Sequence, residues 1–436
     1  MQRLAIFVSL LLAGAGCAET AIPIPEQAPG APSKADEAGF TVSGIESWYL
    51  VGNALTPGDD RLEVTVEAAE PVEVIDLWLD RQFAARGHAS GGRVDIAVDL
   101  EGLDPGEHEI LLAADGAEFA FAQRFFRRSH PLYVVVSNDW DDSDNGDAML
   151  ERQERLHDRH PALLLTHFVG PYTFTDPALP AARRDFLVDW VTDLRDREGD
   201  EIGLHIHPYC HFVESAGIDC RTDHSFARST GDATGYTIFL GSYSEDEFTA
   251  LLEHAIELFA GAGLGRPTSF RAGGWTLEPQ TMRALAATGF VADTSAANWA
   301  RMEEWEDNPG ATLFQWNRDH WFPIDESSQP YYPSQSDLLS VSSPRVSVLE
   351  VPDNGLLVDY VTGSEMIDMF EVNLGTGILP APRVYSIGYH PPNFSESFFA
   401  RMDQALGEID RHLAAADLGP VVYARLSDLV HVWPRQ

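Results

Sequence analysis

An acidic stretch directly after an apolar run is the first sign of chemistry in this sequence. In SNDWDDSDNGD (137–147), Asp139 and Asp141 lie two residues apart and follow LYVVV (132–136). Side chains two apart on an extended strand point to the same face. We therefore expect both carboxylates on one side of a strand end, with the side chain of Trp140 on the other.

A histidine cluster repeats this spacing in GLHIHPYCH (203–211). His205 and His207 lie two apart, point the same way on a strand and can share one divalent ion. His207 and His211 are four apart, a spacing that suits a helix, but Pro208 favours a loop there. We prefer His205 and His207 as the pair, with His211 as an alternative ligand or an outer partner.

Three further polar residues follow apolar runs later in the chain: Arg271 in TSFRAGG, Asp293 in FVADTS and His390 in SIGYH. Each alone is weak evidence of function, because a single histidine is usually structural and an Arg–Asp pair is usually a salt bridge. Their shared position at the ends of apolar runs suggests that one architecture brings them together.

The pattern after residue 130 alternates apolar strands with helices, which predicts a parallel sheet. Eight apolar segments and the amphipathic stretches between them favour a closed or distorted (β/α) barrel over 130–436, in the α/β class. The segment SEDEFTALLEHAIELF also carries a capping box, from Ser244 to Glu247. In such a barrel the functional residues lie at the carboxyl ends of the strands, so the acids, histidines and arginine should meet on one rim.

A calcium loop is an alternative for the acidic stretch, but its spacing fails. With Asp141 at the first position of an EF-hand loop, Arg152 occupies the twelfth, which requires a glutamate. The remaining acids, Asp142, Asp144 and Asp147, are expected to solvate the turn and to begin the next helix, where negative charge is favourable.

Residues 40–127 have a different pattern, in which short alternating runs are separated by turn sequences such as PGDD, SGG and ADG. Such spacing predicts a small β-sandwich of immunoglobulin-like type. No chemical constellation stands out there, so we interpret this region as a spacer or accessory binding domain.

The charge of the chain limits its partners. The formal net charge is −39, and Lys34 is the only lysine. A field of this sign repels phosphate backbones, which argues against nucleic acid as a partner. Because Lys34 lies in a Pro/Ala-rich stretch, no phosphate-loop or Schiff-base lysine is expected in the folded part.

The N-terminus indicates export. MQRLAIFVSLLLAGAGC (1–17) has a basic start, an apolar segment and small residues before Cys17, as in a signal peptide. Cys17 resembles a lipobox cysteine, so we expect a bacterial lipoprotein anchored to the membrane in the periplasm or at the cell surface. If Cys17 is not lipidated, the protein is secreted. Residues 18–39 then form a flexible tether, and an oxidising compartment allows a Cys210–Cys220 disulfide.

A long insertion over 295–345 is rich in tryptophan and tyrosine. Aromatic faces suit stacking on sugar rings, but aromatic residues also form local cores under long loops, and the sequence leaves both interpretations open. We name Trp316 and Trp321, together with Trp275 in FRAGGW, as candidate substrate-binding residues.

Taken in order, these motifs resemble the polysaccharide deacetylase (NodB-homology) family, carbohydrate esterase family four. SNDWDD is similar to the family's acidic first motif, EIGLHIHPYCH to its histidine motif, FRAGGW to its arginine motif, VADTS to its aspartate motif and SIGYH to its last histidine. The resemblance covers about 130–430. The histidine motif departs from the family form, because Tyr209 stands where the second histidine is expected.

The resemblance implies a role for each residue. Asp141 would be a ligand of a divalent metal, most simply Zn²⁺, beside His205 and His207. Asp139 would be the general base and Arg271 would hold it. The general acid would be His390, and Asp293 would orient His390 or Arg271, or be structural.

The function so implied is metal-dependent hydrolysis of N- or O-linked acetyl groups on a cell-envelope or extracellular polysaccharide. An alternative is an inactive glycan-binding protein of the same fold that acts in polysaccharide export or surface assembly. A binding protein needs no base, acid and orienting arginine together, which disfavours this alternative. A glycosidase could use two carboxylates, but it would leave the histidine pair unexplained.

Overall fold

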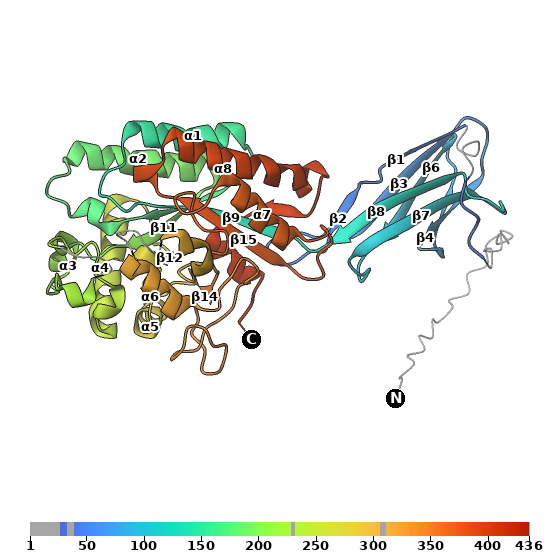
Figure 1. Cartoon of the computed structure of the whole chain (residues 1–436). Helices are drawn as coiled ribbons and strands as arrows, with labels where there is room; N and C mark the ends of the chain where they lie inside the picture. The colour runs from blue at the N-terminus through green and yellow to red at the C-terminus, as the bar shows by residue number, and fades with distance from the viewer. Residues whose placement is uncertain (1–26, 33–38, 228–231, 306–310, 436) are drawn as a thin grey trace, which may run out of the picture. The chain divides into compact units, whose positions relative to one another are not determined.

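The computed structural model describes residues 27–32, 39–227, 232–305 and 311–435 (Figure 1). The predicted signal peptide with Cys17, and residues 18–26 and 33–38 of the predicted tether, lie outside the described residues. Within the described part, no helix has the length and apolar character needed to cross a membrane.

The chain divides into two compact units. The first draws on residues within 1–43, 63–98 and 109–124, and the second on 44–62, 99–108 and 125–436. The second unit therefore includes segments that the sequence pattern assigns to the sandwich.

The N-terminal region forms two β-sheets. One has the order β1 (Phe40–Ser43), β3 (Arg61–Ala68) and β6 (Arg93–Asp99). The five strands of the other, in sheet order, are β2 (Trp48–Leu50), β8 (Ala122–Ser129), β7 (Gly106–Ala114), β4 (Val74–Leu79) and β5 (Gln82–His88). Buried and exposed residues alternate along β3 and β6, as expected for strands with one face in a core. Two sheets are thus present where the sequence pattern predicted a β-sandwich.

The second unit contains an eight-stranded parallel sheet. Its order is β14 (Leu349–Glu350), β13 (Ala292–Asp293), β12 (Ser269–Ala272), β11 (Glu201–Ile206), β10 (Leu165–Val169), β9 (Leu132–Asp139) and β15 (Arg383–Tyr389), and β16 (Val421–Tyr423) also pairs with β9. The α/β class and the parallel sheet are as predicted.

The ring between β14 and β15 is completed by irregular chain rather than by a regular strand. Leu357 forms a parallel bridge with Gly388, and the amide of Gly355 donates to the carbonyl of Ser386 at 2.8 Å. A Cβ on Gly388 would lie 2.5 Å from the Ser137 carbonyl oxygen, which explains the glycine. The structure is therefore a distorted (β/α) barrel, as expected.

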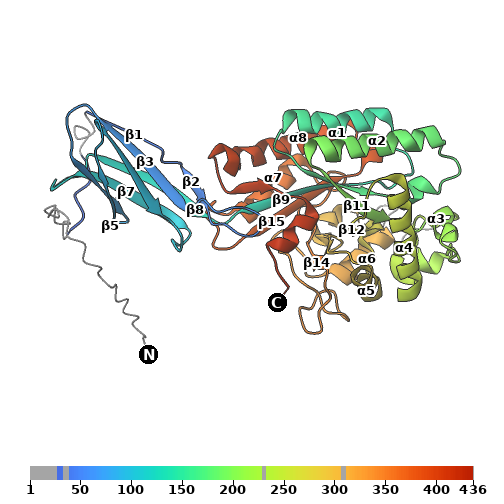
Figure 2. The same ribbon diagram turned by 180° about the vertical axis from the view of Figure 1, so that it is seen from behind.

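Helices cover the outside of this sheet (Figures 1 and 2). α1 (Asp147–Arg159), α2 (Ala181–Glu198) and α8 (Glu396–Ile409) lie along one side, and α4 (Glu245–Ala262), α5 (Pro279–Ala287) and α6 (Ala311–Trp321) along the other. α3 (Cys210–Ser215) and α7 (Gly363–Leu374) complete the set of α-helices in the described chain. α4 begins with the predicted capping box of Ser244 and Glu247.

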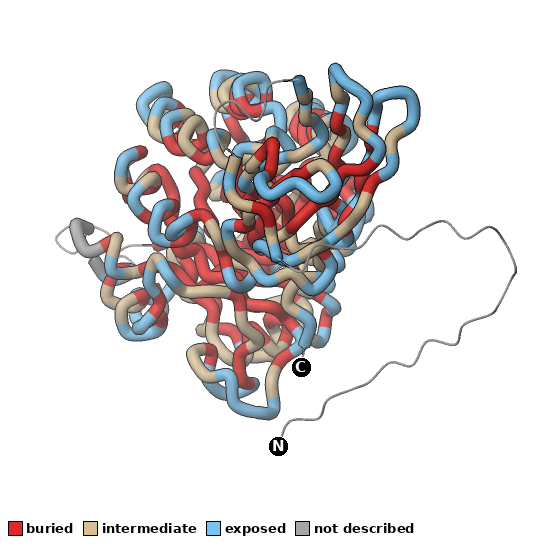
Figure 3. The backbone as a smooth tube through the Cα atoms, turned by 90° about the vertical axis from the view of Figure 1, so that its right-hand side faces the viewer, coloured by how far each residue is buried: buried red, intermediate tan, exposed pale blue. Residues whose placement is uncertain are grey.

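The strands of the barrel are mostly buried, whereas the outer faces of the helices are exposed (Figure 3). Every residue of β9 is buried, because both faces of a parallel sheet are covered. Burying a valine or leucine side chain contributes about 1.5–3 kcal/mol relative to leaving it exposed. This core fixes the strands and therefore the positions of the side chains at their carboxyl ends.

Candidate active site

The carboxyl ends of the strands converge on one cavity. Asp139 is the last residue of β9, His205 lies near the end of β11, and Arg271 lies opposite His205 on β12. His390 directly follows β15. The cavity has a volume of about 190 Å³ and is lined by Asp139, Asp141, His205, His207, Tyr236, Ala272, Gly274, Trp275, Asp359, Tyr360, His390 and Asn393. The predicted rim is thus present.

Asp141, His205 and His207 form one cluster. The Nε2 atoms of His205 and His207 lie 3.1 and 3.2 Å from the same oxygen, Oδ1 of Asp141. In the described chain, this is the one group of three His, Cys, Asp or Glu residues whose candidate ligand atoms all lie within 4.8 Å of one another. Both histidines are buried, so the positions of their rings are fixed by packing.

The contacts of the outer nitrogens indicate which nitrogen of each imidazole faces Asp141 as a donor atom. Nδ1 of His205 lies 2.9 Å from the carbonyl oxygen of Arg271, and Nδ1 of His207 lies 3.1 Å from that of Tyr236. A carbonyl only accepts, so both Nδ1 atoms carry hydrogen, and in the neutral ring Nε2 has a lone pair. Two lone pairs and a carboxylate oxygen then face one another, an arrangement that a shared cation satisfies.

The carboxylate of Asp141 is held ionised. Burial raises its pKa, but the charge of His390 and the neighbouring imidazoles of His207 and His205 outweigh burial and hold the pKa well below its usual range. An ionised carboxylate with two imidazole nitrogens is a common donor set for Zn²⁺.

Asp139 is paired with Arg271, as the family resemblance implies. Nη1 of Arg271 donates to Oδ1 of Asp139 at 3.1 Å, and Nη2 lies 3.5 Å from Oδ2 of Asp353. The indole nitrogen of Trp275 donates to the same Asp353 oxygen at 3.0 Å. Burial raises the pKa of Asp353 to about 6 despite the opposing charge of Arg271. One buried guanidinium therefore lies between two carboxyl groups.

His390 is paired with Asp359. Nδ1 of His390 lies 3.0 Å from Oδ2 of Asp359, and Nε2 lies 3.8 Å from Oδ2 of Asp141. Burial lowers the pKa of the imidazole, but the charges of Asp359 and Asp141 raise it to about 10. His390 is thus an imidazolium at neutral pH, with one N–H fixed and the other directed at the cluster.

The hydrogen bonds of Asp293 fit the structural alternative, although its charge also acts on Arg271. Its carboxylate accepts from the amide and hydroxyl of Ser295 at 3.0 and 2.9 Å, and it is hydrogen-bonded to Glu350. His390 is paired with Asp359. Arg271 is paired with Asp139 and Asp353. Asp293 ends the short strand β13, is wholly buried and does not line the cavity.

His211 lies apart from the cluster. Its Nδ1 is 2.9 Å from the hydroxyl of Thr175, and its ring stacks on Tyr209. The pair beside Asp141 is therefore His205 and His207. The sulfur atoms of Cys210 and Cys220 form the predicted disulfide.

The three tryptophans have different environments. Trp275 lines the cavity. Trp316 is half-buried, and its ring stacks on those of Phe239 and His320. Trp321 is wholly buried, and its indole nitrogen donates to the carbonyl of Trp275 at 2.9 Å. Trp321 is thus a core residue that supports Trp275, and the expectation that it binds substrate is wrong.

Three residues of the site escaped the sequence analysis: Asp353, Asp359 and Tyr236. Asp353 follows the apolar run VSVLEV at the end of β14, so the rule that identified the other acids could have found it. Asp359 and Tyr236 lie in irregular chain, where no periodic pattern marks a position.

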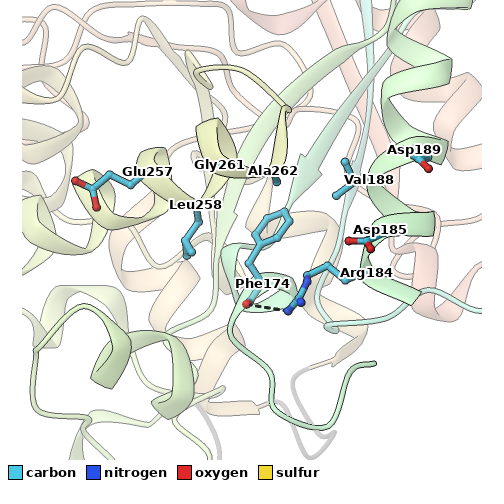
Figure 4. A pocket seen from close by; sticks show the side chains of 9 residues that line it. All are labelled: Phe174, Arg184, Asp185, Val188, Asp189, Glu257, Leu258, Gly261 and Ala262. Atoms are coloured by element: carbon cyan, nitrogen blue, oxygen red, sulfur yellow. Dashed lines mark hydrogen bonds between the residues drawn. The ribbon is translucent and has the colours of Figure 1, made fainter. Parts of the chain in front are cut away.

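A larger hollow of about 470 Å³ lies between α2, α4 and the turn at Phe174 (Figure 4). The Arg184 side chain donates to the backbone carbonyl of Phe174 at 3.3 Å. The acidic side chains that line it come from the outer faces of the helices rather than from strand ends. Although larger than the cavity on the rim, it lacks a convergent set of chemical groups.

Comparison with models of known families gives no match, and comparison with curated proteins gives none either. Comparison with solved structures finds similar chains. One, from Mycobacterium smegmatis and provisionally described as a polysaccharide deacetylase, has 16% identity and a TM-score of 0.41, with 70% of this chain and 90% of that chain covered.

Another similar structure is a family 4 carbohydrate esterase from Streptomyces lividans in complex with acetate, with 12% identity, a TM-score of 0.35 and coverage of 69% and 95%. A third is a variant of a peptidoglycan deacetylase from Bacillus subtilis, with 11% identity, a TM-score of 0.35 and coverage of 70% and 92%. These descriptions name the class that the motifs resemble.

Proposed function

We propose that this protein is a metal-dependent hydrolase that removes N- or O-linked acetyl groups from a polysaccharide. The observation that carries the proposal is the position of Oδ1 of Asp141 between the two Nε2 atoms of His205 and His207. The Asp139–Arg271 pair and an imidazolium, His390, share the same cavity.

The donor set fits a divalent ion. Asp141, His205 and His207 would hold it through one oxygen and two nitrogens, and the carbonyls bonded to the Nδ1 atoms orient both rings. When bound, such an ion polarises an acyl carbonyl and lowers the pKa of a bound water, and Zn²⁺ suits these ligands.

Asp139 is placed to accept a proton from the attacking water. Its carboxylate lines the cavity, two residues from Asp141, and its Oδ1 accepts a hydrogen bond from Arg271. The guanidinium is buried and bonded through Nε to the carbonyl of Thr294 at 3.1 Å. Arg271 therefore keeps Asp139 in one orientation.

His390 is placed to give a proton to the departing amine or alcohol. Because Asp359 holds the Nδ1 hydrogen, Nε2 carries the transferable proton on the side of the cavity. A positioned acid of this kind contributes roughly 10²–10⁴-fold to rate. Base and acid are thus separate residues on different strands.

The size of the cavity supports a small acyl group as the reacting part. At about 190 Å³ it is smaller than the roughly 300–1,000 Å³ of usual ligand pockets. The rest of the glycan would then lie outside it, with Trp275 at the wall of the cavity and Trp316 as the candidate residue beyond it.

We further propose that the protein acts outside the cytoplasm. The leader sequence supports export, and Cys17 supports a lipid anchor in the membrane. The Cys210–Cys220 disulfide is compatible with an oxidising compartment.

Acetate release from a panel of N- and O-acetylated glycans, by the mature protein loaded with Zn²⁺, tests the proposal. We expect release that stops on chelation, returns with Zn²⁺ and is abolished by Asp139→Asn and His205→Ala. Asp147→Asn is the matched control, because Asp147 belongs to the same acidic stretch but is 82% exposed and paired with Arg183. Release that survives complete removal of metal would contradict the mechanism, and tight glycan binding without release would favour the binding protein.

A further inference from the structure

One tyrosine contacts two of the three residues that would bind metal. The hydroxyl of Tyr236 donates to Oδ2 of Asp141 at 2.9 Å, and its backbone carbonyl accepts from Nδ1 of His207 at 3.1 Å. Its ring also lies 4.3 Å from that of His207. Tyr236 thus touches the carboxylate and an imidazole at once.

These two contacts have different effects on the donor set. The carbonyl selects the tautomer of His207 that carries hydrogen on Nδ1 and presents the Nε2 lone pair to Asp141. The hydroxyl engages Oδ2 of Asp141, while Oδ1 faces the two histidines. Asp141 would therefore offer one oxygen rather than two, and positions on the ion stay open for water and a substrate carbonyl.

The chain that carries Tyr236 is irregular, and side-chain hydrogen bonds give it its shape. Oδ1 of Asp232 accepts from the amides of Thr234 and Gly235 at 2.7 and 3.0 Å, and Oδ2 accepts from the Thr237 hydroxyl at 2.9 Å. One buried carboxylate therefore organises the turn over 232–237.

This turn packs directly on the disulfide. The amide of Cys210 donates to the carbonyl of Thr234 at 2.7 Å. Gly235 has a φ of +83°, and a Cβ there would lie 2.3 Å from the carbonyl oxygen of Pro208 and 3.1 Å from Sγ of Cys220. Only glycine allows this approach, so the position of Tyr236 depends on the chain that the cystine closes.

We propose that Tyr236 is a positioning residue for the metal site, and that the Cys210–Cys220 disulfide stabilises the turn that presents it. This inference rests on the proposed function, because it concerns affinity for the ion that Asp141, His205 and His207 would hold. It assigns the disulfide a role at the site in addition to its role in stability.

The first test is the affinity of Tyr236→Phe for Zn²⁺, measured by competition with a chromophoric chelator. The substitution keeps the ring and the carbonyl and removes only the hydroxyl. Loss of an outer hydrogen bond to a ligand weakens metal binding by roughly 10–100-fold, and we expect a loss of about 10-fold. Tyr385→Phe is the matched control: its buried hydroxyl donates to the carbonyl of Met366 at 2.6 Å, so it should leave the affinity for zinc unchanged.

The second test is the zinc affinity of Cys210→Ser/Cys220→Ser, with near-ultraviolet circular dichroism to confirm folding. We expect a loss at least as large as that of Tyr236→Phe, because both contacts of Tyr236 are weakened. If the double variant does not fold, Gly235→Ala examines the same packing with both cysteines in place. Folded variants of the turn that bind zinc as tightly as the wild type overturn the role of the disulfide.

The outcomes separate this inference from the proposed function. If the wild-type protein binds no zinc, both fail. If the wild type binds zinc and Tyr236→Phe binds equally well, the role of Tyr236 is overturned while the proposed function stands.

Discussion

Two clusters in the barrel unit have the same composition, an aspartate contacted by two histidines, and differ in every other respect. Asp141 lies between His205 and His207 on the rim. Asp200 lies between His157 of α1 and His167 of β10, with both Nε2 atoms 3.0 and 2.9 Å from its Oδ2. The composition of a cluster therefore does not determine its role.

The difference lies in what the outer nitrogens contact. At the rim, Nδ1 of each histidine donates to a carbonyl, which leaves the lone pairs of Nε2 facing Asp141. In the interior, Nδ1 of His167 lies 3.0 Å from the amide nitrogen of Asn138, from which it can accept, and 3.3 Å from the amide oxygen. When Nδ1 accepts from the shorter contact, Nε2–H of His167 donates to Asp200 and no cation is required, whereas the rim cluster is the group whose donor atoms could hold a metal ion.

The surroundings agree with this distinction. Asp200 precedes β11, its Oδ1 accepts from the amide of Leu165 at 2.9 Å, and only 1% of the residue is exposed. The side chain of Asp141 is 18% exposed and borders a cavity. These surroundings support the proposal that the Asp141 cluster serves chemistry, and they favour a structural role for the Asp200 cluster.

The largest expected effect is that of Asp141→Ala on metal binding. Removing a direct ligand should weaken zinc binding by more than roughly 100-fold, because even outer partners contribute 10–100-fold. Competition titration measures the affinity, with Asp147→Ala as control. An affinity within a few-fold of the wild type would place the ion elsewhere.

The next largest effect is on catalysis without loss of metal. His390→Ala should lower the rate of acetate release by roughly 10²–10⁴-fold, with zinc affinity within a few-fold of the wild type. Asp359→Asn should show the same pattern with a smaller loss, because Asp359 acts through Nδ1 of His390. An unchanged rate in His390→Ala would remove the assigned acid.

The interior cluster should behave in the opposite way. Burial raises the pKa of Asp200, but hydrogen bonds from His157 and His167 lower it to about 2. A folded-state pKa below the unfolded value contributes stability above about pH 4, and that contribution is lost as the pH falls toward 2.

Asp200→Asn should therefore lower the free energy of unfolding by about 2 kcal/mol at pH 7. The difference from the wild type should shrink between pH 4 and pH 2. Urea unfolding over this range measures both. A variant that loses zinc affinity while keeping its stability would contradict the assignment of the two clusters.

A smaller effect is expected at a carboxyl pair without histidine. Burial raises the pKa of Asp293 to about 6, and burial together with the charge of Asp293 raises that of Glu350 well above its usual range. When the pKa of a carboxyl group is raised in the folded state, the free energy of unfolding falls as the pH rises above the unfolded pKa of about 4.

Glu350→Gln should remove part of this penalty. The side-chain amide of the new glutamine can donate to Asp293. Its side-chain oxygen can still accept from the backbone amide of Ala296, which lies 2.8 Å from Oε1 of Glu350. We expect a flatter dependence of stability on pH and a gain of about 1 kcal/mol at pH 8. A loss of stability at pH 8 would show that the pair is stabilising.

Much of this architecture was accessible from sequence. Apolar runs with polar residues at their ends predicted the barrel, and the two-residue spacing predicted that Asp141 would share a face with Asp139 and His205 with His207. These features follow from strand periodicity, which is local.

What escaped prediction depends on contacts made far along the chain. Asp359 meets His390, and Tyr236 meets Asp141, through irregular segments whose paths no local pattern determines. Asp293 is buried at the end of β13, and its hydrogen bonds go to Ser295 and Glu350, residues that no local pattern links to it. The sequence gives no means of distinguishing Trp321 from Trp316, because both lie in the same aromatic-rich segment. Only packing in the folded chain makes Trp321 a core residue and leaves Trp316 half-buried.

The most direct test of the account is an anomalous difference map from crystals of the wild-type protein grown with one equivalent of Zn²⁺. We predict one peak at about 2.0–2.2 Å from Oδ1 of Asp141 and from the Nε2 atoms of His205 and His207. A peak at the Asp200 cluster, or none at the rim, would contradict the assignment of the metal site and the function proposed from it.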